Sequence, residues 1–198
     1  GIKAHLMPSK PLRRARSYSQ SPGLAGRQTQ SWGRNHTPGD MTPLTIFTIG
    51  HSTRPIDEFI RLLKAHGVER VVDVRTIPRS RHNPQFNRDE LEQVLSAHAI
   101  AYRFFGKELG ARSDDPSCYV SGKVRYERLA HTALFRNGLD RLVSGTKQNL
   151  RIALMCAEKE PLECHRTILV ARRLAERGLE IQHIHADGSL ESHAGALV

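Results

Sequence analysis

The chain has 198 residues, of which 38% are hydrophobic, and it carries a formal net charge of +10 with a pI near 10.1. This length suits one folded domain, and no apolar run approaches the roughly 20 residues that a membrane helix needs, which excludes a membrane-embedded protein. The three cysteines, Cys118, Cys156 and Cys164, do not form the pattern of a secreted disulfide framework, so we expect free thiols and a cytoplasmic location.

Residues 1–41 are rich in serine, proline, glycine and arginine and lack hydrophobic periodicity. We therefore predict a disordered basic tail, followed by a single domain over residues 42–198. The tail holds seven basic residues against one acid, Asp40, and so accounts for +6 of the net +10. It is either a nucleic-acid-binding or targeting arm or an extension without a role, and Met41 is a candidate for the natural start of the protein.

The first half of the domain alternates strand and helix patterns. A β-branched run over residues 44–49 stops at Gly50-His51-Ser52, which is typical of a buried strand that ends in a tight turn. Pro55 is suited to the first position of a helix that ends at Gly67. Residues 68–74 form the predicted second strand, which contains Asp73 and ends at Arg75.

A basic loop follows over residues 75–87, and its proline and serine content argues against regular structure. Asn87 with Glu90 three residues later has the form of a capping box, which opens a helix over residues 88–98. The third strand is predicted over residues 101–105. A second long loop occupies residues 106–122, and unstructured segments of this length are often functional.

The second half continues the alternation. We predict a helix over residues 126–142, a buried fourth strand over Ile152–Met155, a helix from Pro161 and a fifth strand over residues 179–184. The prediction is a three-layer α/β domain with a mainly parallel, doubly wound sheet of five strands. The order 3-2-1-4-5 would place His51 and Ser52 beside Cys156, with Asp73 one strand further out, and 2-1-3-4-5 is the alternative order.

The segment from Ile152 to Arg166 concentrates reactive side chains at one strand end and one helix start, where ligands bind in open α/β folds. Cys164, beside His165 and Arg166, is placed where the pKa of a thiol falls and a thiolate is favoured. It is the preferred nucleophile. Cys156 closes an apolar strand and is either a redox partner or, like many free cysteines, a packing residue.

Zinc is the only cofactor that the residues leave open. Cys156, Cys164 and His165 with His51 or His185 could bind it, but the Cys-x7-Cys-His spacing is unusual, and adjacent side chains on a helix point about 100° apart. We therefore assign no metal ligand. The sequence also lacks the glycine patterns of nicotinamide and nucleoside-triphosphate sites.

Acid–base and anion-binding candidates surround the same segment. Glu158, Asp73 and His51 are candidates for proton transfer if they converge, although Asp73 could equally form an ion pair with Arg75 or Arg166. The residues that could bind a phosphate or carboxylate are Ser52, Arg75, Arg79, Arg81 and Arg166. Such arginines could equally be solvated surface charges.

Four stretches resemble the family known as domain of unknown function 488. They are Thr48-Ile-Gly-His-Ser52, Asp73-Val-Arg75 with Pro78-Arg-Ser-Arg81, Leu109-Gly110, and Leu154-Met-Cys-Ala-Glu-Lys-Glu-Pro-Leu-Glu-Cys-His-Arg166. The resemblance runs from about residue 45 to 186. It implies a compact α/β domain with a pair of cysteines suspected of forming an active site, and it implies no reaction.

These observations predict an enzyme that acts on an anionic, phosphate- or nucleotide-like substrate, with a thiol-dependent hydrolase or transferase as the expected class. Its candidate catalytic residues are Cys164, Cys156, Glu158, His165, His51 and Asp73. Two alternatives stay open. One is a nucleic-acid-binding or interaction module that uses the basic loops and the tail, and the other is a non-catalytic metal or redox-binding domain.

Overall fold

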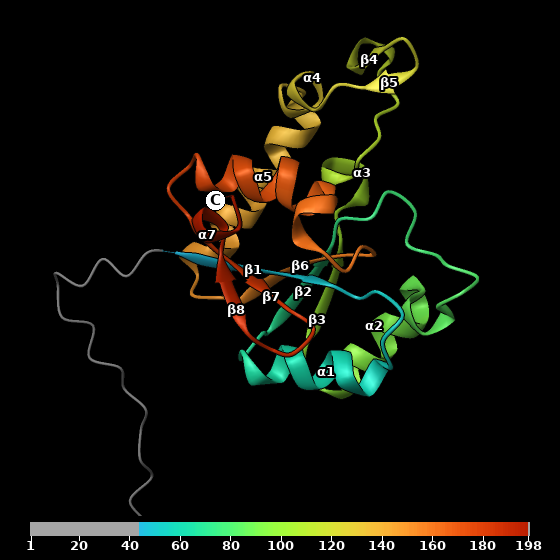
Figure 1. Ribbon diagram of the computed structural model, residues 1–198, viewed down its shortest axis with the longest axis vertical. Helices are drawn as coiled ribbons and strands as arrows, with labels where there is room; N and C mark the ends of the chain where they lie inside the picture. The colour runs from blue at the N-terminus through green and yellow to red at the C-terminus, as the bar shows by residue number, and fades with distance from the viewer. Residues whose placement is uncertain (1–43, 198) are drawn as a thin grey trace, which may run out of the picture. The chain divides into compact units, whose positions relative to one another are not determined.

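A computed structural model describes residues 44–197 of the chain. The predicted basic tail and Met41 lie outside the described residues. A mixed α/β domain is built around a central sheet (Figure 1). The strands of this sheet are β1 (Thr45–Gly50), β2 (Arg70–Asp73), β3 (Ala101–Phe104), β6 (Ile152–Cys156), β7 (Glu180–Ile184) and β8 (Leu190–Ser192).

The helices of the described residues are α1 (Ile56–Ala65), α2 (Arg88–Ala97), α3 (Gly106–Leu109), α4 (Tyr126–Ala130), α5 (Ala133–Lys147), α6 (Arg172–Ala175) and α7 (His193–Ala196). Short 3₁₀ helices are η1 (Pro84–Phe86), η2 (Pro116–Cys118) and η3 (Pro161–Glu163), and η4 (Arg166–Ala171) is a π-helix. A small hairpin of β4 (Tyr119–Val120) and β5 (Lys123–Val124) projects away from the sheet (Figure 1). No helix in this part of the chain is both long and apolar enough to cross a membrane.

The sheet confirms the predicted α/β class and its mostly parallel character, but its strand order differs from both predictions. The order is β3-β2-β6-β1-β7-β8, and β8 alone in this sheet runs antiparallel to its neighbour. The predicted fourth strand, β6, lies between β1 and β2. The strand of Asp73 is therefore a direct neighbour of the strand of Cys156, whereas the prediction placed the strand of His51 between them. The sixth strand, β8, was not predicted because its three residues are too short for a periodic pattern.

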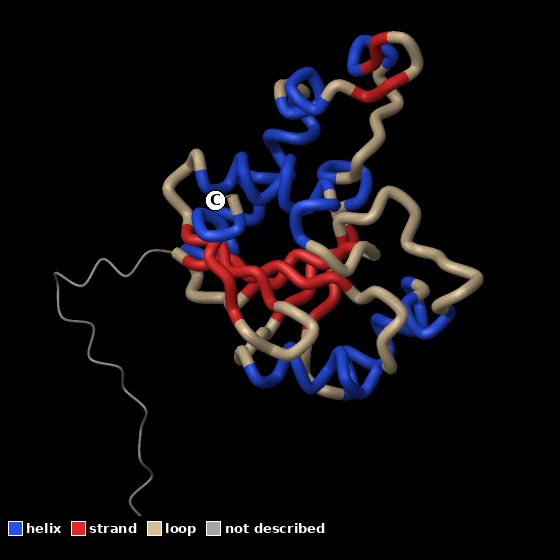
Figure 2. Tube along the Cα trace, in the orientation of Figure 1, coloured by secondary structure: helices blue, strands red, loops and turns tan. Residues whose placement is uncertain are grey.

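Helices lie on both faces of the sheet (Figure 2). The alternating residues of β6 pack into two different hydrophobic cores. Ile152 and Leu154 pack with α5 and the segment 169–174 on one face. Ala153 and Met155 pack with α1 and α2 on the other. Because side chains alternate along a strand, Cys156 belongs to the first face, the same one that receives Cys164.

Two predicted helix details are wrong. Asn87 precedes α2 but makes no side-chain cap, because its Oδ1 instead accepts a hydrogen bond from the Ser80 amide at 2.8 Å. The helix predicted over residues 126–142 is two helices, since Thr132 is extended and its hydroxyl accepts a hydrogen bond from the Phe135 amide to begin α5. The loop over 106–122 contains α3, η2 and β4.

Candidate functional site

The carboxyl ends of β1, β2 and β6 meet at one edge of the sheet, as the sequence predicted. The parallel ladder of β1 and β6 continues past the strands, because the His51 and Ser52 amides donate to the carbonyls of Cys156 and Ala157, both at 2.9 Å. Ser52 has a φ of 49°, in the left-handed region that costs energy for a residue other than glycine. The turn is therefore held in place by the β6 backbone.

Gly50 explains how closely the loop after β6 approaches this turn. A Cβ atom at position 50 would lie 1.8 Å from the carbonyl oxygen of Glu158, so only glycine fits there. The guanidinium of Arg166 donates to that same carbonyl at 2.6 Å and to the Lys159 carbonyl at 3.1 Å. Arg166 is 1% exposed and thus supports the loop from inside the protein.

An open pocket of about 470 Å³ lies at this edge. Its lining includes His51, Ser52, Arg75, Arg79 and Glu158, which were all predicted site residues. The side chains of Arg79 and Glu158 are exposed, whereas those of His51 and Arg75 are buried at its floor.

Four side chains form what we call the Arg75 network: His51, Asp73, Arg75 and Tyr102. The Arg75 guanidinium donates from Nε and NH2 to the two carboxylate oxygens of Asp73, at 2.9 and 2.6 Å. The Tyr102 hydroxyl donates to Asp73 at 2.8 Å. Burial alone would lower the pKa of Arg75, but the hydrogen bonds and charge of Asp73 raise it, and burial raises the pKa of Tyr102.

The same network fixes the ring of His51. Arg75 NH1 donates to Nε2 of His51 at 3.1 Å, so Nδ1 carries the proton and donates to the Ser52 carbonyl at 2.8 Å. The ring also stacks on Phe86, with centroids 4.3 Å apart. Burial lowers the pKa of His51 to about 4, against the opposing effect of the Ser52 carbonyl. Both ring nitrogens are occupied, which makes His51 a support for Arg75 in this arrangement.

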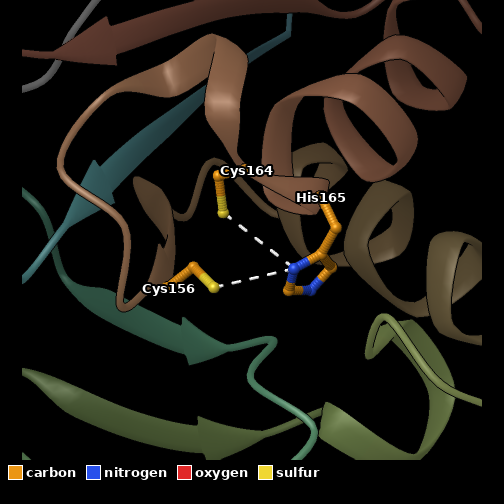
Figure 3. Close-up of side chains that lie close together, drawn as sticks. All are labelled: Cys156, Cys164 and His165. Atoms are coloured by element: carbon orange, nitrogen blue, oxygen red, sulfur yellow. Dashed lines mark hydrogen bonds between the residues drawn. The ribbon is translucent and has the colours of Figure 1, made fainter.

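Three other side chains form what we call the thiol cluster: Cys156, Cys164 and His165 (Figure 3). Their donor atoms all lie within 4.8 Å of one another. The Nδ1 atom of His165 faces both sulfurs, at 3.7 Å from Cys156 and 3.9 Å from Cys164. The Nε2 atom donates to the Val74 carbonyl at 2.9 Å, which leaves the lone pair of Nδ1 directed at the thiols.

Cys164 lies just before the helix and not, as was predicted, in its first turn. Cys164 is extended, with φ −124° and ψ 138°, and it precedes the helical residues instead of sitting within the first turn. Its carbonyl accepts hydrogen bonds from the Thr167 and Ile168 amides, and its sulfur accepts one from the Arg166 amide at 3.4 Å. The extended residue lets the side chains of Cys164 and His165 converge, and the helix then continues as the π-helical η4, a form often found at functional sites.

The two thiols have opposite electrostatic tendencies. The adjacent Cys156 thiol lowers the pKa of Cys164 most, and His165 and Arg166 lower it further, while burial opposes them. The contact with Cys164 and burial raise the pKa of Cys156. A single thiolate in the cluster is therefore favoured on Cys164. Burial raises the pKa of Tyr126, at the start of α4, and the charge of a thiolate on Cys164 or Cys156 raises it further.

The predicted site residues therefore fall into two adjacent groups. The lining of the pocket includes none of Cys156, Cys164 and His165, all of which the structure describes. Arg81 is exposed and outside the lining, and Arg166 has both terminal nitrogens bonded to carbonyls. Three residues near these groups were not predicted from the sequence: Tyr102, Phe86 and Tyr126. Only Tyr102 could have been found, as a polar ring on a strand next to that of Asp73.

A protein-family model matches most of the domain. The model for domain of unknown function DUF488 matches residues 55–173, which include Asp73, Arg75 and the thiol cluster but not His51 and Ser52. No curated protein and no solved structure matches the chain. Because the matched segment exceeds half of the sequence, this chain belongs to the family described as domain of unknown function DUF488.

Proposed function

We propose that this chain is an enzyme that binds a small anionic, phosphate- or nucleotide-like substrate in the pocket and attacks it with the thiolate of Cys164. One observation carries the proposal: two consecutive residues after β2, Val74 and Arg75, connect the thiol cluster with the pocket. Val74 holds the ring of His165 through its carbonyl at 2.9 Å, and Arg75 lines the pocket. A substrate beside Arg75 would thus lie next to the thiol cluster.

Two arginines would hold the anion, and Lys159, Glu158, Glu160 and Glu163 also line the pocket. Arg75 and Arg79 both line the pocket. Asp73 already holds the side chain of Arg75 in place, so binding of a ligand there loses no conformational entropy of Arg75. Of the five N–H groups of its guanidinium, four have hydrogen-bond partners, which leaves one on NH1 for a ligand. Glu158, exposed at the rim, would move protons of the substrate or of water.

The proposed chemistry is nucleophilic substitution. Nδ1 of His165 takes the proton of the Cys164 thiol, and the sulfur forms a bond to the phosphorus or acyl carbon of the substrate. The bond to the leaving group breaks, and the leaving group receives the proton from His165. Water then releases the product in a hydrolase, or a second substrate does so in a transferase. The Arg166 amide, at 3.4 Å from the sulfur, stabilises the thiolate before attack.

Alkylation of the metal-free chain by iodoacetamide tests the nucleophile without a known substrate. Cys118 is the matched control, because it is free and 1% exposed, as Cys164 is. We expect Cys164 to react at least about tenfold faster than Cys118 at neutral pH, since each unit of thiol pKa changes the thiolate fraction about tenfold. Equal rates for the two cysteines, measured by peptide mass spectrometry, would refute the thiolate mechanism.

Protection by inorganic phosphate or adenosine monophosphate tests the anion site. We expect either ligand to slow alkylation of Cys164, and Arg79→Ala to remove the protection. Arg81→Ala is the matched control, because Arg81 is an exposed arginine of the same loop that does not line the pocket. Equal loss of protection in the two variants, or no protection in the wild type, would contradict a phosphate-like substrate in this pocket.

A further inference from the structure

The thiol cluster has a property that the proposed reaction does not use. Cys156, Cys164 and His165 bring two sulfurs and one imidazole nitrogen within 4.8 Å of one another (Figure 3). A tetrahedral zinc ion, with sulfur at about 2.3 Å and nitrogen at about 2.0 Å, would hold a sulfur and a nitrogen about 3.5 Å apart. The two observed distances from Nδ1 to sulfur are 3.7 and 3.9 Å. The nitrogen is therefore spaced from each sulfur almost as such an ion requires, and the two sulfurs lie within 4.8 Å of each other.

The orientation of the imidazole also matches that of a metal ligand. A ligating histidine generally donates its other ring N–H to a carbonyl or carboxylate, which sets the tautomer and the ring angle. Nε2 of His165 donates to the Val74 carbonyl at 2.9 Å, so the lone pair of Nδ1 is free to face the space between the sulfurs. The Arg166 amide supplies a hydrogen bond to the sulfur of Cys164, which would reduce the charge of a metal-bound thiolate.

The objection that adjacent Cys and His side chains diverge on a helix does not hold in this structure. Cys164 has an extended backbone, and only His165 adopts helical angles, with φ −59° and ψ −25°. The change of conformation between these two residues turns both side chains to the same side. The sequence spacing is thus compatible with joint binding of one ion.

We propose that Cys156, Cys164 and His165 form a binding site for a thiophilic divalent cation of the zinc class, with three protein ligands. Two thiolates neutralise the two charges of the ion, which suits residues that are 1% to 9% exposed. Sulfur and imidazole donors favour zinc over magnesium or calcium, which bind oxygen. Neither histidine considered as a fourth ligand is free for it, because His51 is bonded to Arg75 and His185 to Glu191.

This inference goes beyond the proposed function and does not depend on it. A cation bound at the three donors takes the sulfur of Cys164 from any substrate, and its binding displaces the protons of the two thiols. The metal-free chain with a reactive Cys164 and the metal-bound chain would then be alternative states of one site. Metal availability would regulate the thiol chemistry.

Cobalt titration of the chelator-treated full chain tests the site directly. Tetrahedral cobalt bound to thiolates gives near-ultraviolet charge-transfer absorption and intense visible bands. We expect both signals to saturate at one ion per chain and to disappear when zinc is added. A wild-type chain that shows no thiolate charge-transfer band at saturating cobalt would overturn the proposal.

Serine variants identify the ligands. Losing an outer partner of a ligand lowers metal affinity 10- to 100-fold, so loss of a ligand itself should cost at least about 100-fold in Cys156→Ser and in Cys164→Ser. Cys118→Ser is the matched control, because Cys118 is also buried and free but lies outside the cluster. Cobalt affinity that is unchanged in both cluster variants, or lost equally in Cys118→Ser, would assign the ion to another place.

A wild-type measurement guards against variants that fail to fold. Zinc should protect Cys156 and Cys164, but not Cys118, from alkylation, and equal protection of all three would contradict the site. The two proposals fail separately. A chain that binds no cobalt but alkylates fast at Cys164 refutes only the metal site, whereas one that binds cobalt but alkylates no faster at Cys164 than at Cys118 refutes only the nucleophile.

Discussion

The Arg75 network and the thiol cluster lie side by side at the same sheet edge, yet they are built in opposite ways. Hydrogen bonds within the Arg75 network are 2.6 to 3.1 Å long and join charged or strongly polar atoms. Contacts within the thiol cluster are 3.7 and 3.9 Å long and involve weakly bonding sulfur. The first group is held in one geometry, and the second has donors that are close together but loosely bonded.

The two buried histidines show the consequence of this difference. In His51 both ring nitrogens have strong partners, so protonation would have to displace Arg75. In His165 one nitrogen is fixed by Val74 and the other faces only the two thiols. The same residue type therefore serves as a support in one group and remains available for a proton or a metal ion in the other.

The largest effect on stability is expected when the Arg75 network loses its only carboxylate. Asp73→Asn leaves the buried charge of Arg75 without its ion pair and turns an amide N–H₂ toward the N–H donors of Arg75. Breaking a buried pair in this way should lower the free energy of unfolding by about 3 to 5 kcal/mol. Urea unfolding followed by circular dichroism measures the loss.

An exposed ion pair of equal length provides the control for this change. Arg177 NH1 and Asp140 are also 2.6 Å apart, but their side chains are 32% and 69% exposed. Asp140→Asn should cost no more than about 1 kcal/mol, because water solvates both charges when the pair is lost. Similar losses in the two variants would show that burial does not determine the strength of the Arg75 network.

Much of this site was predictable because strand ends follow from local patterns. The apolar runs before His51, Arg75 and Cys156 identify β1, β2 and β6, and parallel strands bring their carboxyl ends to one edge. The strand order was not predictable, since nothing in the sequence of β6 states that it pairs with β1 on one side and β2 on the other.

The finer contacts depend on backbone groups that a sequence does not display. The carbonyl of Val74 orients His165, and valine in a strand indicates only a β-former. The extended conformation of Cys164 likewise has no signal in its side chain, so the sequence placed it inside the helix. Tyr102 was interpreted as an ordinary strand residue, because its bond to Asp73 depends on the pairing of β3 with β2.

A third buried polar group consists of neutral side chains that hydrogen-bond to one another around His183. His183 of β7 shares hydrogen bonds with Thr48 at 2.7 Å and with His193 at 3.2 Å. Burial lowers the pKa of His183 to about 4, and the charges of His193, Arg166 and His185 lower it further. The pKa of His193 is also lowered, by burial and then by Arg172.

We expect this histidine pair to make the protein sensitive to acid. The contribution of His183 to stability is complete above the unfolded pKa of 6.5 and falls as the pH approaches 4, because the unfolded chain binds the proton first. The loss should approach about 3 kcal/mol, from about 1.4 kcal/mol for each unit of pKa. Urea unfolding at pH 7.5 and at pH 4.5 measures it. His183→Gln should show a smaller loss, and an equal loss in variant and wild type would place the acid sensitivity elsewhere.

The smallest effect is expected from removing one neutral donor from the Arg75 network. Tyr102→Phe deletes the hydroxyl that donates to Asp73 at 2.8 Å but leaves the hydrogen bonds from Arg75 in place. A hydrogen bond to a buried carboxylate contributes about 1.5 kcal/mol or somewhat more, and we expect urea unfolding to show a loss of that size. Tyr119→Phe is the matched control, because its half-buried hydroxyl in β4 bonds only uncharged groups: it donates to the Ser113 carbonyl at 2.9 Å and accepts from the Ser113 amide at 3.2 Å. The control should lose about 0.5 to 1 kcal/mol, and a loss in Tyr102→Phe no larger than this would mean that Arg75 alone satisfies the carboxylate of Asp73.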